Sequence, residues 1–274
     1  MPQARELFEA AKLQEAIEQV TNDVRANPSE VSHRTFLFEL LCFAGDWDRA
    51  EKQLDVIGHQ SALAELGVMI YRAVIKAEKE RQRLFSEGAT PHFLKEPPSY
   101  VDMNLDAINK ARSGNFEEAR TILERAEEER PAIAGKIDGQ DFADFRDADD
   151  FLAPVLEVFV KDKYVWMPLE QIKSVEVQPP NKLRDLLWAN ARIESLDGTI
   201  AELYLPAIYE GTGEHADNEA KLGRLTDWRQ LGPDLFRTVG LRMFQIDESD
   251  KTLFELRKIE FNHATSTDVA AAPQ

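Results

Sequence analysis

Two groups of arginine and aspartate in the second half of the chain are the best candidates for catalytic chemistry. Arg184 stands beside Asp185, and Arg224 precedes Asp227 by three residues. With Tyr209 these side chains could form an active site, in which a carboxylate transfers protons and an arginine holds an anion. The alternative is that each arginine forms a fixed ion pair that orders a loop, and we favour this structural role.

The other reactive side chains do not show the spacing of a metal or nucleophile site. The five histidines, none of which is part of a His-Glu-x-x-His motif, are His33, His59, His92, His215 and His263. Only His215, which shares a loop with Asp217 and Glu219, gives a weak metal signal. The single cysteine, Cys42, lies in an apolar run that predicts a buried and unreactive thiol. We therefore expect no catalytic residue, metal or cofactor.

An acidic segment precedes the second half of the chain. Its aspartates are Asp138, Asp141, Asp144, Asp147, Asp149 and Asp150. A calcium loop needs alternating ligands, a central glycine and a closing glutamate, and that order is absent. The segment therefore predicts a solvated linker or the start of a helix. Further along, Gly211-Thr212-Gly213 lacks the lysine and hydroxyl residue of a phosphate-binding loop.

The charge of the chain excludes some classes of partner. Its 274 residues carry a formal net charge of −17, which repels nucleic-acid phosphates. The one basic cluster, at 76–83, also contains Glu78 and Glu80 and predicts a solvated helix face. No stretch of about 18 apolar residues is present, so we expect no membrane insertion. A lone cysteine fits a reducing compartment, and we expect a cytoplasmic protein.

A repeat in the first half predicts pairs of helices. Three segments share a small residue, a polar one, an apolar one, two polar ones and then an alanine, at Ala16, Ala50 and Ala119. Ala50 follows Ala16 by 34 residues, which is the tetratricopeptide period, and Ala119 follows Ala50 by 69, close to two periods. We predict a tetratricopeptide-like superhelix over residues 1–135, with a long helix at 61–85 and a loop at 86–99.

In a superhelix of this kind the first helix of each pair lines a concave groove that can take a partner's helix. In the second unit that helix is predicted at 31–44. Its register directs Thr35, Glu39, Cys42 and Phe43 toward the groove and puts Arg34 at its edge. Phe43 would be an apolar anchor, while Glu39 and Arg34 would orient the incoming helix. The alternative is that Phe43 packs against the neighbouring pair of helices.

From residue 154 onward the pattern favours β-strands. Apolar runs at 155–160 and 164–167 are separated by a short turn, and Asp197-Gly198 predicts a type I′ hairpin before 199–205. A further hairpin is predicted between 235–246 and 253–261, and a short helix near 182–188. The expected fold class is α+β, with a mainly antiparallel, curved or barrel-like domain at 136–264. Residues 265–274 are expected to be a disordered tail.

Six short motifs follow one another in this second half. They are Phe145-Arg146-Asp147-Ala148-Asp149-Asp150, Tyr164-Val165-Trp166-Met167-Pro168, Leu183-Arg184-Asp185-Leu186-Leu187-Trp188, Leu205-Pro206-Ala207-Ile208-Tyr209, Gly223-Arg224-Leu225-Thr226-Asp227-Trp228 and Gly240-Leu241-Arg242. In this order they resemble the ImpE family, also called TagJ or SciE-type accessory proteins of the bacterial type VI secretion system. The resemblance covers nearly the whole chain. It implies a non-catalytic cytoplasmic protein that associates with the small sheath subunit and with the AAA+ ATPase that recycles the sheath.

Most side chains of these motifs are predicted to be structural. Trp166, Trp188 and Trp228 would bury a large aromatic area in the second half, or else form an exposed hot spot for a partner. The remaining motif residues with an expected structural role are Arg184, Asp185, Leu187, Pro206, Tyr209, Gly223, Arg224, Thr226 and Asp227. We therefore predict an adaptor; an enzyme with the arginine–aspartate site described first, and a subunit with a purely structural role, are the alternatives.

Overall fold

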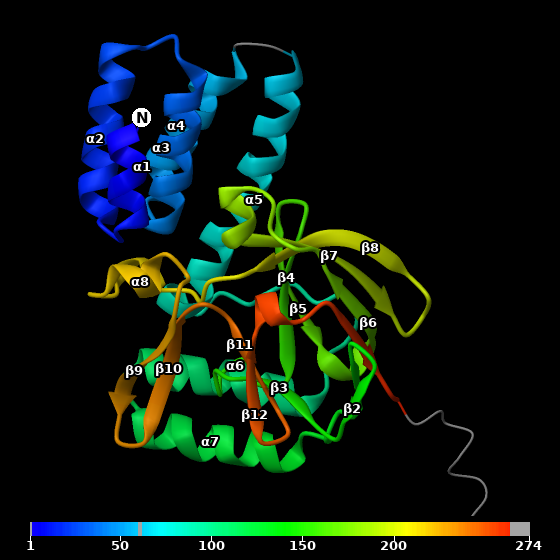
Figure 1. The fold of residues 1–274 in the computed structure, drawn as a ribbon. Helices are drawn as coiled ribbons and strands as arrows, with labels where there is room; N and C mark the ends of the chain where they lie inside the picture. Colours follow the sequence, from blue (N-terminus) through cyan, green and yellow to red (C-terminus); the bar gives the residue numbers. More distant parts are fainter. Residues whose placement is uncertain (1, 60–61, 264–274) are drawn as a thin grey trace, which may run out of the picture.

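Helices fill the first half of the chain in the computed structural model, which describes residues 2–59 and 62–263 (Figure 1). They are α1 (Pro2–Glu9), α2 (Leu13–Ala26), α3 (Val31–Phe43), α4 (Trp47–Gly58), α5 (Ala62–Glu87), α6 (Ser99–Arg112) and α7 (Phe116–Glu129). Helices α1 and α2, α3 and α4, and α6 and α7 pack as successive pairs, while α5 packs mainly on α4. Among the helices of the described ranges, none has the length and hydrophobicity needed to cross a bilayer.

The repeat register predicted from the sequence is confirmed. Ala16, Ala50 and Ala119 are fully buried in α2, α4 and α7, where an alanine lets two helices approach closely. The turns before α4 and α7 contain Gly45 and Gly114 with φ of 69° and 80°. Because this left-handed conformation favours glycine, both residues end the preceding helix and allow the chain to reverse.

An eight-stranded antiparallel sheet is the main layer of the second half, in the order β2-β1-β13-β6-β7-β8-β4-β5. Its strands are β1 (Gly135–Ile137), β2 (Gln140–Phe142), β4 (Val155–Val160), β5 (Lys163–Pro168), β6 (Ile172–Val177), β7 (Trp188–Ser195), β8 (Ile200–Pro206) and β13 (Lys258–Phe261). Two smaller sheets pair β9 (Thr226–Gly232) with β10 (Leu235–Gly240), and β11 (Met243–Ile246) with β3 (Phe145–Asp147) and β12 (Ser249–Thr252). The predicted fold class is confirmed, with a sheet that is open and not closed into a barrel.

Two predicted hairpins differ in detail from the structure. Strands β7 and β8 do form a hairpin, but only Gly198 has a positive φ in its turn, whereas a type I′ turn needs two such residues. The hairpin between 235–246 and 253–261 is wrong. Strand β11 pairs with β12, and the 3₁₀ helix Leu253–Glu255 then redirects the chain so that β13 pairs with β1 and β6. The predicted helix near 182–188 is the 3₁₀ helix Leu183–Leu186.

The helical and β-rich parts share one hydrophobic core. Trp188 at the start of β7 is buried against Phe38, Trp47 and Tyr71, with ring centroids 6.4, 6.4 and 5.9 Å away. Its indole Nε1 donates a hydrogen bond of 2.8 Å to Glu78 of α5. The predicted boundary at 135/136 falls at the start of β1, and we propose that the two parts fold as one unit. The predicted tail at 265–274 lies outside the described residues.

A buried ion network joins α5 to the sheet. Arg81 of α5 donates to both carboxylate oxygens of Glu157 in β4, each at 2.9 Å. Arg242 contacts the same carboxylate and donates to Asp147 at 2.6 Å. Burial alone would raise the pKa of Glu157, but Arg81 and Arg242 lower it to about 2. Burial raises the pKa of Asp147 to about 6, with Arg242 opposing the rise, so all four side chains are charged and paired in the interior at neutral pH.

This network corrects two predictions. The segment 76–83 is not a solvated helix face, because Glu78 and Arg81 are buried. The acidic segment at 138–150 is neither a solvated linker nor the start of a helix, because it forms strands and buries Asp147 and Asp149. Asp149 accepts a hydrogen bond of 2.7 Å from Arg237. The partners Glu157, Arg237 and Arg242 are distant in the sequence, so the local charge pattern did not show that these side chains are buried.

Removing Arg81 should destabilise the protein strongly. We expect Arg81→Met to lower the free energy of unfolding by about 3–5 kcal/mol, since it leaves Glu157 buried with one arginine fewer. Urea denaturation followed by circular dichroism measures this. The matched control is Arg83→Met, which removes an exposed pair with Glu87 and should cost no more than about 1 kcal/mol. Equal losses for the two variants would contradict a role for the buried pair.

The tryptophans provide a second comparison. The prediction that Trp228 is buried is wrong, since 49% of it is exposed on β9, whereas Trp188 is buried. We expect Trp188→Ala to lower the free energy of unfolding by about 3–5 kcal/mol through the cavity that it creates. Trp228→Ala should change it by about 0.5 kcal/mol or less, as is usual for surface positions. A loss for Trp228→Ala as large as that for Trp188→Ala would show that the exposed ring is structural.

Candidate protein-interaction surface

Arg184 and Asp185 have separate structural partners. The guanidinium of Arg184 lies 3.8 Å from Glu39 and 4.6 Å from the ring centre of Tyr71. Asp185 accepts two backbone N–H groups, each at 2.9 Å, from the residues that precede the 3₁₀ helix Leu183–Leu186. The arginine therefore ties this turn to the helical part, and the aspartate fixes the shape of the turn itself.

The other candidates for an active site lie in different surroundings. Arg224 donates to the backbone carbonyls at the end of α1, at 2.9 and 3.0 Å. Asp227 lies 3.6 Å from Nε2 of His215, and the buried Tyr209 donates to Asp147 at 2.7 Å. Within the described ranges, no hydrogen bond or ion pair joins two of the five candidates. Nor do those ranges contain a group of three acidic, histidine or cysteine side chains placed to hold a metal ion.

The remaining motif residues make contacts that support a structural role. Trp166 and Leu187 are buried in the core, the carbonyl of Pro206 accepts from Arg242 at 2.9 Å, Gly223 has a φ of 63°, and Thr226 donates to the carbonyl of Leu241 at 2.8 Å. Trp228 differs from these residues because much of its ring is exposed.

The groove predicted on α3 is filled by the chain itself. Phe43 is only 2% exposed and packs against Phe8 of α1, with ring centroids 5.8 Å apart. Glu39 faces Arg184 of the β-rich part, and burial raises its pKa against the opposing effect of Arg184. Arg34 donates to Gln53 of α4 at 3.3 Å, and Thr35 is half-buried. The structure therefore supports the alternative in which Phe43 packs inside, and partner binding by these four residues stays a prediction.

A row of exposed apolar side chains lies on α5, whose first half projects beyond the sheet (Figure 1). Leu66, Met69 and Ile70 are 58%, 60% and 43% exposed, and their spacing puts them on one helical face. They line a groove of about 650 Å³, whose other wall is formed by β4, β7 and β8. We call this the α5 groove. Its sheet wall consists of Phe159, Lys161, Gln178, Asn190, Ala191, Arg192, Glu202, Leu203 and Tyr204.

Exposed apolar rows in a concave surface mark interaction sites, because isolated soluble proteins usually cover them. The signal was present in the sequence, where residues 66, 69, 70 and 73 follow helical spacing within the predicted long helix. Periodicity shows which residues share a face, but it does not show whether another element of the fold covers that face. The sequence therefore did not distinguish this row from a buried one.

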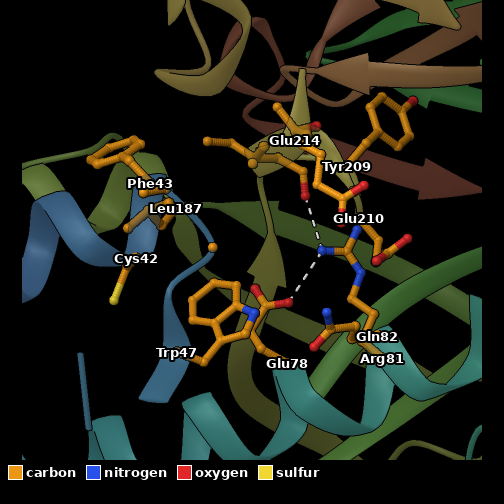
Figure 2. A pocket seen from close by; sticks show the side chains of 16 residues that line it. Cys42, Phe43, Trp47, Glu78, Arg81, Gln82, Leu187, Tyr209, Glu210 and Glu214 are labelled. Atoms are coloured by element: carbon orange, nitrogen blue, oxygen red, sulfur yellow. Dashed lines mark hydrogen bonds and ion pairs between the residues drawn. The ribbon is translucent and has the colours of Figure 1, made fainter. Parts of the chain in front are cut away.

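A smaller cavity of about 100 Å³ lies beside the buried ion network. Figure 2 shows Arg81 at its wall, with contacts to Glu78 and to a backbone carbonyl. That carbonyl belongs to Ile208 and accepts from Arg81 at 3.0 Å. The cavity is small for a ligand pocket, and its arginine is already paired, so we regard it as part of the structural network.

Comparisons with known proteins agree with these observations. Residues 139–260 match the family model of the ImpE protein. Over 258 residues the chain is 38% identical to the type VI secretion system accessory component TagJ of Pseudomonas aeruginosa, covering 94% of this chain and 90% of that protein. A crystal structure of a protein from Vibrio parahaemolyticus shares the fold, with a TM-score of 0.88 and 24% identity over 97% of this chain and 99% of that one. The chain therefore belongs to the ImpE/TagJ family of type VI secretion accessory proteins.

Proposed function

We propose that this chain is a non-catalytic adaptor of the type VI secretion system, acting in the bacterial cytoplasm. It binds the small subunit of the contractile sheath or the AAA+ ATPase that recycles the sheath, or both. The observation that supports binding most directly is the exposed apolar row in the α5 groove. Family membership supports the secretion system as its setting.

The groove can contribute a moderate part of a binding energy. Full burial of a leucine, isoleucine or methionine side chain is worth about 1.5–3 kcal/mol. Because Leu66, Met69 and Ile70 are each roughly half exposed, covering them would contribute about 2–4 kcal/mol in total. Association itself has an entropic cost, so further contacts outside this row are needed for a stable complex.

The contacts of the catalytic candidates support an adaptor over an enzyme. Arg184 and Arg224 hold together elements of the fold, and Tyr209 is hydrogen-bonded in the interior. An acid–base pair needs two groups within reach of one substrate atom, and these residues face different partners.

A carboxylate placed in the groove should weaken binding of the partner. We expect Met69→Glu to reduce affinity for the purified sheath small subunit, or for the purified ATPase, by about tenfold or more, because the new charge must be desolvated. Isothermal titration calorimetry with each partner measures this. The control is Leu94→Glu, which changes an apolar residue of similar exposure (59%) outside the groove and should leave binding unchanged.

A third variant separates the two candidate surfaces. If Glu39→Lys abolishes binding while Met69→Glu does not, and circular dichroism shows both variants folded, the partner surface is on α3 and not in the α5 groove. If the unmodified chain binds neither purified partner, the proposed function is wrong.

A further inference from the structure

A third cavity, of about 330 Å³, lies between the helices and the β9–β10 ribbon. It is bordered by the end of α5, the α6–α7 turn and the loop at 210–214. Its apolar walls are Phe85, Ile108, Phe116, Phe151 and Leu231. This volume lies at the lower end of the range for small-molecule pockets, which starts at about 300 Å³.

Charged side chains of both signs line this cavity. They are Arg112, Arg229 and Arg237 together with Glu210 and Glu214. In the described part of the chain, none of these arginines forms an ion pair with either glutamate, because their nitrogen and carboxylate oxygen atoms are more than 4.0 Å apart. Arg229, Glu210 and Glu214 have no side-chain hydrogen bond there, and Arg112 reaches only Asn109, at 3.3 Å. Arg112, Arg229 and Glu214 are exposed to solvent, whereas Arg237 is buried and Glu210 is half-buried. Arg237 and Glu210 interact electrostatically without forming a direct ion pair.

Arg229 lies beside the loop at 210–214, on the same cavity as Arg237. A Cβ built on Gly211 would lie 3.9 Å from a guanidinium nitrogen of Arg229, so this arginine extends over the loop that carries both glutamates. Burial raises the pKa of Glu210, with Arg237 opposing the rise. A ligand cation beside Glu210 would lower this pKa again.

Arg237 has an incomplete set of hydrogen bonds. Its guanidinium lies 3.9 Å from the ring centre of Phe85, and its Nε donates to Asp149 at 2.7 Å. Its Nη2 is buried and, among the described residues, has no acceptor. Because an unpaired buried donor is costly, an acceptor supplied by a ligand would stabilise this arrangement.

We propose that this cavity binds a small zwitterion of the α-amino acid class with an apolar side chain. Its carboxylate accepts from Arg229 and Arg237, its ammonium group donates to Glu210 and Glu214, and its side chain packs against Phe85. A ligand with only one of the two charges leaves the opposite lining charges without a partner and binds more weakly. This site is separate from the α5 groove and does not depend on the proposed function.

The test is isothermal titration calorimetry of the full chain with L-leucine and L-phenylalanine. N-acetyl-L-leucine lacks the ammonium charge and L-leucinamide lacks the carboxylate, and each should bind at least about tenfold more weakly than leucine. Arg229→Gln and Glu214→Gln should each weaken leucine binding by about tenfold, while neither removes a contact of the fold. The control Arg125→Gln changes an exposed arginine of α7 outside the cavity and should have no effect.

Three results would overturn the proposal. The first is that neither leucine nor phenylalanine binds at millimolar concentration. The second is that N-acetyl-L-leucine or L-leucinamide binds as tightly as leucine, which would mean that the cavity selects only one charge. The third is that Arg229→Gln and Glu214→Gln bind leucine as the unmodified chain does, which would place the ligand elsewhere.

Discussion

The buried pair of Arg81 and Glu157 is the contact on which the arrangement of the two halves depends. Taking two charges out of water costs several kcal/mol for each ion, and only good geometry and further hydrogen bonds offset that cost. Here the arginine meets both carboxylate oxygens, and Arg242 and Asp147 complete the set. A shifted docking of helix and sheet would leave charges unpaired in the interior. The network therefore favours one relative position, which apolar packing alone would define less sharply.

Local signals in the sequence predicted the elements but not this pairing. The alanines at the helix crossings, the glycines of two turns and the β-branched strand at 155–160 each act over a few residues, and these predictions were correct. Arg81 and Glu157 are 76 residues apart in the chain, and the local sequence around Arg81 contains only its nearer partner, Glu78. For the same reason the sequence predicted that the acidic segment at 138–150 is exposed to solvent. In the fold, Asp149 and Asp147 accept hydrogen bonds from Arg237 and Arg242.

The candidate interaction surface also depends on contacts between residues that are distant in the sequence. Helices α3 and α5 both carry large apolar side chains, Phe38 and Phe43 on α3 and Leu66 and Met69 on α5. The sequence predicted that the α3 face with Glu39 and Phe43 is open, but Phe8 of α1 covers Phe43 and Arg184 of the β-rich part covers Glu39. The face of α5 stays open because the sheet packs on the later turns of that helix. Which face is free follows from the docking of the two halves and not from hydrophobicity.

The position of Arg242 near the end of the described chain has a consequence for synthesis on the ribosome. The helical part precedes the β-rich part in the chain, so the α3 face and Arg81 are made before Glu157. Arg242 leaves the ribosome only after nearly every strand of the large sheet has been made, and until then Glu157 and Asp147 lack one of their cations. The ion network therefore becomes complete only after Arg242 has been made, and until then Arg81 is the arginine of the network that can pair with Glu157.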